Sequence, residues 1–293
     1  MEQFIEKADV LIEALPYIRS FQGKVVVVKY GGAALNQDEV RKSIFQDLIF
    51  MRLVGIRPVL IHGGGKEISE EIRKLGKEPR FVAGLRVTDR ETIEVVERTL
   101  GAINQRITEE VVQLGGRARG MSGKEDKIFF AKKYEAQEDV GFVGRITFVH
   151  AAPVEKVVRQ NIIPIVTPLG LGQDGEAYNI NADEASAQLA VGLGAEKLVL
   201  LTDVAGILKD PENPASLVTH VGLAEIPALI ERGVVQDGMI PKTQSASEAI
   251  AGGVKKVHVL DGRIKHSLLL EIFTDKGVGT EIVKENGDTG TPR

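Results

Sequence analysis

Two glycine-rich turns are the first places in this sequence where chemistry could take place. Gly31-Gly32 follows the apolar run at residues 24–28, and Gly63-Gly64-Gly65 follows the apolar run at 57–61. Each turn precedes a helical pattern, so backbone N–H groups and a helix dipole converge at one point. Glycine also lets a ligand approach the backbone closely. A single glycine turn is as often structural, but two in successive units make phosphate or carboxylate cradles the favoured interpretation.

Charged residues accompany these turns. Lys29 ends the first apolar strand, and ligands bind at the carboxyl ends of strands in open parallel sheets. Lys242 follows a glycine and a proline just before a predicted helix. Asn179, Asn181 and Asp183 alternate with apolar residues, which predicts that they share one side of an extended run. Alone, Asp183 could be an N-cap and each lysine could be solvated; the combination with two glycine turns has no such simple account.

The composition excludes several classes of protein. Lys and Arg number 37 against 41 Asp and Glu, so the net charge of −4 argues against a nucleic-acid partner. The chain has no cysteine, which excludes disulfides, thiolate chemistry and Cys-ligated metals. Its histidines show no paired metal-binding spacing, so we assign no metal ligand. No apolar run approaches the roughly 20 residues of a membrane span, and the N-terminus lacks signal-peptide features. We therefore expect a cytoplasmic protein.

Strand–turn–helix repetition must position these residues. Buried strands are predicted at 24–28, 57–61, 162–166, 196–201 and 255–260. Helices are predicted at 38–54, from the second glycine turn to about 75, and at 89–114, 183–193, 222–232, 241–251 and 267–273. Residues 115–149 are glycine-rich with β-rich pieces and predict hairpins at a sheet edge. The alternation predicts an α/β protein with three layers, in which helices cover both faces of an open, mainly parallel sheet.

An amphipathic helix is predicted ahead of the first strand. Its apolar stripe is formed by Phe4, Ala8, Leu11, Leu15 and Ile18. Pro16 should end or kink this helix near Leu15. Two interpretations stay open, since the helix could pack on its own domain or bind a neighbouring subunit. At the other end, the tail at 285–293 is expected to fray.

Six short motifs together resemble the acetylglutamate kinases of the amino acid kinase family. They occur in the family's order at residues 29–32 (KYGG), 62–65 (HGGG), 84–89 (GLRVTD), 178–183 (YNINAD), 201–203 (LTD) and 238–242 (GMIPK). The resemblance covers about residues 4–283. It departs at Lys66, where the family usually has proline after the three glycines, which puts in question the rigidity of this loop rather than its chemistry.

The resemblance implies transfer of the γ-phosphoryl group of ATP to the side-chain carboxylate of N-acetyl-L-glutamate. A carboxylate with a pKa of about 4.3 is already ionised at pH 7, so no general base is needed. Lys29 and Lys242 would then offset charge on the transferring oxygens, and Asp183 would organise both lysines. Mg²⁺ would arrive with ATP, and we assign it no dedicated protein ligand.

The resemblance also divides the remaining site residues between two lobes. Residues 1–194, the N-terminal lobe with its helix extension, would bind acetylglutamate and dimerise; residues 195–293 would bind ATP. Arg86 would grip the α-carboxylate of acetylglutamate with its planar fork. The other implied substrate contacts are Gly64, Gly65 and Asn179, and the implied ATP contacts are Gly31, Gly32, Thr202, Asp203 and Lys209.

The C-terminal region resembles the arginine-sensitive branch of these kinases. That resemblance implies feedback inhibition by L-arginine in a hexamer built as a trimer of dimers. Glu271 would pair with arginine, with Tyr17, His258 and Gly277 completing the pocket; alternatively, Glu271 is a solvated residue of a terminal helix. Docking of a PII-type signalling protein stays open.

Three other functions stay open as well. A kinase of the same fold could phosphorylate another carboxylate, a carbamate or UMP. A silent amino-acid sensor could have kept the fold, although both lysines and Asp183 argue against it. A dinucleotide oxidoreductase is the third, but the sequence lacks its glycine fingerprint.

Overall fold

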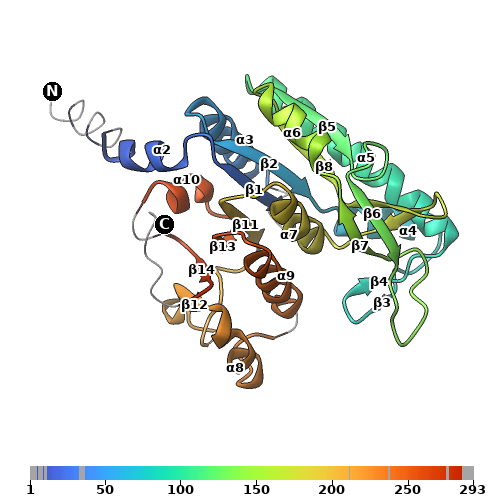
Figure 1. Cartoon of the computed structure of the whole chain (residues 1–293). Coiled ribbons are helices and arrows are strands. Elements are labelled where there is room, and N and C mark those ends of the chain that lie inside the picture. Colours follow the sequence, from blue (N-terminus) through green and yellow to red (C-terminus); the bar gives the residue numbers. More distant parts are fainter. Residues whose placement is uncertain are drawn as a thin grey trace.

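An eight-stranded sheet runs through the molecule (Figure 1). The computed structural model describes residues 5, 9, 12–32, 37–210, 212–236, 238–274 and 277–285. The strand order is β12-β14-β13-β11-β1-β2-β8-β5, and neighbours are parallel except for the antiparallel pair of β13 and β14. The strands are β1 (Val25–Tyr30), β2 (Arg57–His62), β5 (Ala118–Ser122), β8 (Ile163–Thr167), β11 (Lys197–Thr202), β12 (His220–Gly222), β13 (Lys256–Asp261) and β14 (Thr280–Val283). The predicted mainly parallel sheet is confirmed.

Helices cover both faces of this sheet because side chains alternate along each buried strand. Val26 and Val28 of β1 pack on one face, and Val27 packs on the other. The first face is covered by α3 (Asp38–Leu53), α5 (Arg90–Gln113) and α10 (Ser267–Ile272). The second face is covered by α6 (Ala152–Arg159), α7 (Ala182–Gly192), α8 (Ile226–Glu231) and α9 (Met239–Ala251). The three-layer arrangement is confirmed.

Smaller elements gather at one end of the main sheet (Figure 1). A second sheet has the order β10-β9-β6-β7, and a separate hairpin pairs two short strands. These strands are β3 (Phe81–Val82), β4 (Leu85–Arg86), β6 (Phe129–Lys133), β7 (Gly144–Val149), β9 (Leu169–Gly172) and β10 (Ala177–Asn179). Helix α4 (Gly65–Lys74) packs on α5 through a small apolar cluster. Apart from this group, two short 3₁₀ turns precede and follow β12 in the sequence, namely η2 (Pro214–Ser216) and η3 (Leu223–Glu225).

The segment at 115–149 differs from its prediction. β5 is an edge strand of the main sheet and runs parallel to β8, so it is not part of a hairpin. β6 and β7 do form an antiparallel pair, but in the second sheet. The long helix α5 precedes β5 and acts as the crossover that a parallel strand requires. The local sequence pattern predicts β-structure in this segment, but which strands pair with one another depends on the crossover helix.

Two prolines mark helix starts, of which one corrects a prediction and the other agrees with one. The single helix predicted at 222–232 is η3 followed by α8, because Pro227 lies in the first turn of α8, where its missing N–H costs nothing. Pro16 likewise lies in the first turn of α2 (Leu15–Phe21), after a turn at Ala14. Helical residues 12–13 thus end at Ala14 and a new helix starts at Leu15, which confirms the predicted break near Leu15.

Several predictions fall outside the described residues. Phe4, Ala8 and Leu11 of the predicted stripe lie there, as do residues 286–293 of the tail. Ile5 and Ile12, which are described, have exposed side chains. Among the described helices, none is long and apolar enough to cross a membrane.

Candidate active site

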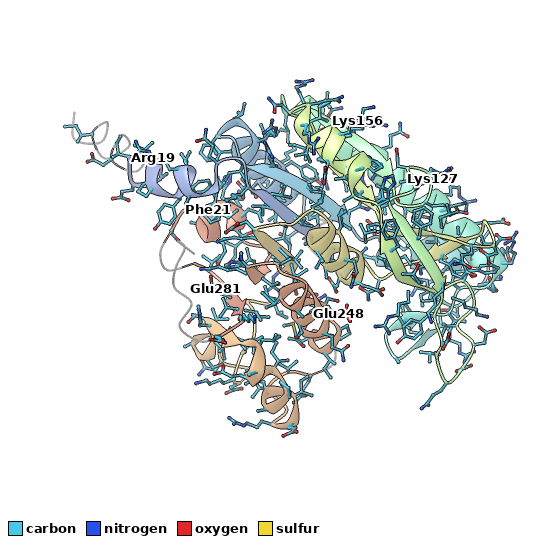
Figure 2. All side chains as sticks on the ribbon, in the orientation of Figure 1. Arg19, Phe21, Lys127, Lys156, Glu248 and Glu281 are labelled. Carbon is cyan, nitrogen blue, oxygen red and sulfur yellow. The ribbon has the colours of Figure 1, made fainter. Side chains whose placement is uncertain are left out.

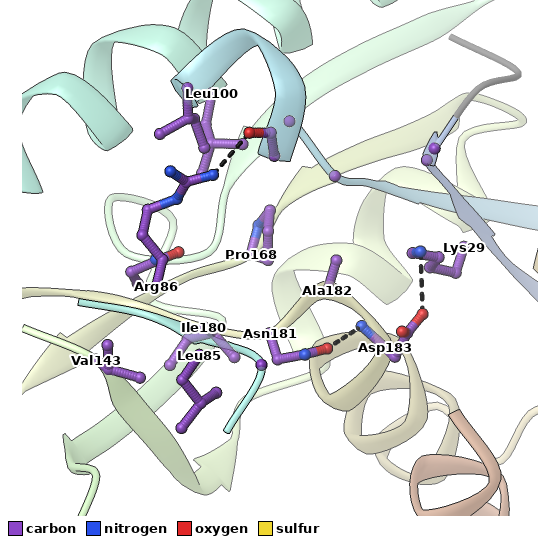
Figure 3. Close-up of a pocket in the computed structure, with 18 of the residues that line it drawn as sticks. Lys29, Leu85, Arg86, Leu100, Val143, Pro168, Ile180, Asn181, Ala182 and Asp183 are labelled. Carbon is purple, nitrogen blue, oxygen red and sulfur yellow. Dashed lines mark hydrogen bonds and ion pairs between the residues drawn. The ribbon is translucent and has the colours of Figure 1, made fainter. Parts of the chain in front are cut away.

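A cavity lies beyond the carboxyl ends of β1 and β2, at the start of α7. Lys29, Arg86, Asp183 and the glycines of both turns line it (Figure 3). The chain leaves β1 for β2 on one side, whereas β11 lies on the other side of β1 and leads on to β13. Such a reversal opens a ligand-binding crevice in open α/β sheets. We call this space, of about 840 Å³, the first cavity.

Asp183 joins the two lysines. Its Oδ1 lies 3.1 Å from Lys29 Nζ, and its Oδ2 accepts a hydrogen bond from Lys242 Nζ at 2.9 Å. Burial alone would raise the pKa of Asp183, but the two ammonium groups outweigh burial and lower that pKa to about 2. The carboxylate is therefore ionised at pH 7 and holds both cations in place.

Asp183 lies in the first turn of α7 and not in an extended run. β10 ends at Asn179, and the Asn181 side chain caps α7 by accepting from the N–H groups of Asp183 and Glu184. The predicted extended run from Asn179 to Asp183 is therefore wrong, and Asp183 is not the N-cap. Because Asn181 caps the helix, the Asp183 carboxylate is free to face the lysines from the first turn, where the helix dipole favours a negative charge.

The two glycine turns adjoin each other at the first cavity. A Cβ added to Gly31 would lie 3.2 Å from Lys29 Nζ and 3.7 Å from the backbone nitrogen of Gly63. A Cβ on Gly64 would lie 2.8 Å from Ile103 Cδ1, so a side chain at this position would press against the apolar side chains of α5. The first N–H groups of α4, which begins at Gly65, have no helical acceptor and can bind an anion.

Lys66, where the family pattern has proline, is the second residue of α4. The helix starts directly after the glycine turn with lysine at this position. Proline is favoured but not required in a first helical turn.

Arg86 is held from three sides in the wall of the first cavity. Its Nη2 donates to the Gly65 carbonyl at 2.6 Å and to Ser69 Oγ at 2.9 Å, and its guanidinium carbon lies 4.7 Å from the centre of the Phe81 ring. Burial lowers the pKa of Arg86, but an arginine stays cationic in proteins. Its Nη1 is buried without a hydrogen-bond partner among the described residues, which leaves a donor for a ligand.

Asn179 also lines the first cavity. Its side-chain nitrogen is 3.4 Å from Thr88 Oγ1, and Thr88 in turn donates to the backbone carbonyl of Arg86 at 2.7 Å. This chain of contacts links the end of β10 to the β3–β4 hairpin. The structure therefore brings Gly64, Gly65, Arg86 and Asn179 to the same cavity.

A second cavity of about 1130 Å³ lies on the other side of Lys242. Thr202 and Asp203 line it at the end of β11, together with Lys242 and Met239 at the start of α9. Lys209 is exposed and is not among the lining residues. Gly31 and Gly32, which were assigned to ATP, line the first cavity instead. Lys242 is thus the residue that faces the second cavity while contacting Asp183 of the first.

A cluster of buried charged groups is formed by Glu271 of α10, His258 of β13 and Lys197 of β11. Glu271 and His258 are fully buried, and the His258 Nδ1 is 2.6 Å from Glu271 Oε1. Burial would raise the pKa of Glu271, but the bond from His258 and the N–H of Val278 lower it to about 2. Glu271 is therefore not a solvated residue. Lys197 lies nearby. Burial, and to a smaller extent the positive charge of Lys256, lowers the pKa of Lys197 to about 7.

The end of helix α2 contacts this cluster. The ring of Phe21, fully buried at the end of α2, lies 4.6 Å from Lys197 Nζ (Figure 2). Tyr17 of α2 is half-buried. Gly277 adjoins Val278 and has a positive φ of 58°. Of the four residues that the resemblance assigns to an arginine pocket, Glu271 and His258 thus pair directly, whereas Tyr17 lies on α2 and Gly277 follows α10.

Sequence reasoning missed several residues that shape the site. Ser69 follows Gly65 by one helical turn, a spacing that could have placed it beside the glycine turn. The sequence pattern marks Asn181 as a polar residue of the motif but does not predict that its side chain caps α7. No sequence signal distinguishes Phe81, whose ring position depends on the β3–β4 hairpin.

Comparison with known proteins agrees with this geometry. A model of the amino acid kinase family matches residues 24–261. The chain is 50% identical over 290 residues to an acetylglutamate kinase of Pelotomaculum thermopropionicum, covering 95% of this chain and 98% of that protein. It is 49% identical over 283 residues to an acetylglutamate kinase of Desulforamulus reducens, covering 96% and 99%.

Solved structures show the same fold. An N-acetylglutamate synthase from Neisseria gonorrhoeae, complexed with coenzyme A and L-arginine, is similar with a TM-score of 0.83 and 30% identity. The similarity covers 95% of this chain and 65% of the synthase. A carbamate kinase from Giardia lamblia bound to AMP-PNP has a TM-score of 0.65 at 18% identity over 90% and 99% of the two chains, which shows the fold alone.

Proposed function

The chain belongs to the amino acid kinase family, among its acetylglutamate kinases, and we propose that it transfers the γ-phosphoryl group of ATP to the side-chain carboxylate of N-acetyl-L-glutamate. The observation that carries this proposal is the Lys29–Asp183–Lys242 group between two cavities. The first cavity binds acetylglutamate and the second binds the nucleotide. Residues 1–194 and 195–293 form the corresponding lobes.

The acceptor is held by its two ends in this proposal. Arg86 presents its unpartnered Nη1 to the α-carboxylate, and Asn179 contacts the acetylamino group. The side-chain carboxylate then points toward the glycine turns and Lys29. Orientation matters because the reaction joins two anions and gains little from acid–base chemistry.

The lysines provide the electrostatic stabilisation. Lys29 lies at the first cavity and Lys242 at the second, so a phosphoryl group passing between the cavities meets one cation on each side. Asp183 keeps both ammonium groups in place before substrate binds, so little reorganisation is needed during the reaction. The acceptor attacks the γ-phosphorus, the bond to the bridging oxygen breaks, and ADP leaves. Gly64 and Gly65 donate backbone N–H groups to the transferring oxygens; Gly31 and Gly32 adjoin them.

Mg²⁺ enters as a partner of ATP in this proposal. Among the described residues there is no group of three or more His, Cys, Asp or Glu side chains that could hold a metal ion. This donor set fits a cation held mainly by phosphate oxygens and water. When bound there, Mg²⁺ would neutralise phosphate charge.

Feedback inhibition by L-arginine in a hexamer is the finer part of the proposal. The cluster of Glu271, His258 and Lys197 beside the end of α2 offers a carboxylate for a cationic ligand and a lysine amine for the ligand's carboxylate. Glu271 already accepts from His258 and Val278, and a carboxylate has lone pairs for further donors. A similar synthase structure holds L-arginine. Light scattering and an arginine titration test this part; a dimer insensitive to millimolar arginine would refute it.

An ATP-dependent hydroxamate assay tests the main reaction, since hydroxylamine traps acyl phosphates. Acetylglutamate, glutamate, aspartate and carbamate are compared as acceptors at equal concentration. We expect product with acetylglutamate well above the others, because Arg86 and Asn179 recognise groups that only this acceptor combines. Preference for carbamate or for unacetylated glutamate would contradict the assignment.

A further inference from the structure

His62 is buried beneath the second glycine turn and is bonded through both ring nitrogens. Its Nδ1 lies 2.9 Å from the Gly63 carbonyl oxygen, and its Nε2 lies 3.1 Å from Asn104 Nδ2. A carbonyl oxygen only accepts, so Nδ1 carries the proton. An amide nitrogen only donates, so Nε2 accepts. The orientation of Asn104 is fixed by a further bond from its Nδ2 to the Ile165 carbonyl at 2.8 Å.

We propose that His62 is a positioning residue, which holds the peptide between Gly63 and Gly64 so that the Gly64 N–H faces the first cavity. This inference rests on the proposed phosphoryl transfer and adds a residue to it. The C=O and N–H of a trans peptide point in opposite directions. Holding the Gly63 oxygen on the His62 side therefore turns the Gly64 N–H away from His62. Gly63 and Gly64 line the cavity, whereas His62 is fully buried and does not.

The glycine turn needs such a restraint. Three successive glycines have no side chains to limit rotation of their peptides. Gly63 N donates to the Tyr30 carbonyl, which fixes the peptide before Gly63 but not the one after it. The bond from His62 fixes that next peptide. Asn104 ties the imidazole to α5 and, through Ile165, to β8, so the restraint comes from three rigid elements.

The arrangement works only with a neutral imidazole. Burial lowers the pKa of His62 to about 4; Arg106 on α5 also lowers it, and the bond to Gly63 acts in the opposite direction. Tyr30, its partner in register on β1, is uncharged at neutral pH because burial raises its pKa. Protonation would set an Nε2–H against the amide hydrogens of Asn104. The restraint therefore persists throughout the neutral range.

Two substitutions separate positioning from packing. The Nδ2 of asparagine is as many bonds from Cα as the Nδ1 of histidine, so His62→Asn keeps a donor for Gly63, whereas the similarly shaped His62→Leu does not. Both lose the acceptor for Asn104. We expect His62→Leu to lose about tenfold or more in kcat with KM for acetylglutamate nearly unchanged, and His62→Asn to recover most of that loss. The matched pair His150→Asn and His150→Leu, at an exposed histidine, controls for loss of an imidazole.

Nitrogen-15 NMR of the full chain decides the same point without activity. An Nδ1–H tautomer of His62 that does not titrate above pH 5 supports the proposal. An Nε2–H tautomer, titration near pH 6.5, or equal kcat in the two His62 variants overturns it. If His62→Leu fails to fold, Asn104→Leu takes its place: it should lower kcat because the imidazole loses its tie to α5, an unchanged kcat would overturn the proposal, and the tautomer result stands. Absence of any acyl phosphate from the wild-type protein would refute the proposed function, and the tautomer would still decide the role of His62.

Discussion

Lys242 Nζ donates to Asp183 Oδ2 at 2.9 Å, although 59 positions separate the two residues in sequence. This bond connects α9 with the first turn of α7 and brings the lining of one cavity into contact with that of the other. In the proposed reaction, a phosphoryl group that crosses from nucleotide to acceptor passes this contact. The bond therefore places a cation at the crossing point before either substrate arrives.

We expect Lys29→Ala and Lys242→Ala each to lose most of kcat while remaining folded. Each removes a cation that offsets phosphoryl charge, and such groups contribute about 3–4 kcal/mol to transition-state stability, a factor of about 10²–10³. Steady-state kinetics beside thermal melting measures this. Lys132→Ala, at an exposed lysine, is the control. Near wild-type kcat in either active-site variant would show that its lysine does not act on the transferring group.

Asp183→Asn should lower kcat without removing an ionisation from the pH–rate profile. The pKa of Asp183 is about 2, so the carboxylate is already ionised at every pH at which the enzyme is assayed. Its stabilising effect is present above the unfolded-state pKa and is lost only as pH falls toward 2. A profile from pH 5 to 9 measures this. A one-proton limb that the variant abolishes would mean that Asp183 titrates as a base.

Arg86→Lys should raise KM for acetylglutamate far more than KM for ATP. Lysine cannot bond to Gly65 and Ser69 and still present a second donor to a carboxylate. We expect an increase of about tenfold or more for the acceptor, the equivalent of a charge-assisted bond. Arg90→Lys, at an exposed arginine of α5, provides a matched comparison. Equal changes in both constants would remove Arg86 from the acceptor site.

The strands that carry the site could be predicted because each is a short apolar run that ends at a glycine turn or a polar residue. Lys29 and the glycine turns were placed in this way, since the carboxyl ends of parallel strands meet along one edge. Asn181 and Asp183 were misplaced because alternation of polar and apolar residues describes a strand and the approach to a helix equally well over six residues. The N-cap of α7 depends on where the backbone changes from extended to helical, which the pattern of polar and apolar residues does not specify.

Other features depend on contacts between distant residues. β9, β12 and β14 have three or four residues each, too few for a periodic signal. His62 and Asn104 are 42 positions apart, and their pairing depends on how α5 packs over β8, the neighbour of β2. The family resemblance implies Lys209 as a nucleotide contact, but Leu208 lines the second cavity whereas Lys209 is exposed and does not.

Asp47→Asn should remove a dependence of stability on pH between about pH 4 and 6. Asp47 of α3 is fully buried, with Oδ1 2.6 Å from His266 Nδ1 ahead of α10. Burial raises its pKa to about 6, and His266 and the N–H groups at the start of α10 offset burial only in part. The folded chain therefore binds more protons than the unfolded chain in this window, and the contribution of Asp47 to the free energy of unfolding falls as pH rises, by about 1–2 kcal/mol.

Urea unfolding at pH 4.5 and 7 measures that change as a difference between variant and wild type. Asp38→Asn, at an exposed aspartate of the same helix, should leave the pH dependence unaltered. If Asp47→Asn and the wild type show the same change between the two pH values, the carboxyl group does not titrate in this window.

Glu271→Gln should raise the arginine concentration for half-inhibition by about tenfold or more, since a charge-assisted bond to the ligand is lost. Glutamine keeps the size of the side chain and can still accept from Val278, so the change removes chiefly the negative charge. Turnover without arginine, measured on the same preparation, shows whether the fold has survived the loss of a charge beside His258. Glu231→Gln, at an exposed residue of α8, is the matched control. An arginine response identical to that of the wild type would place the inhibitor elsewhere and return Glu271 to a purely structural pairing with His258.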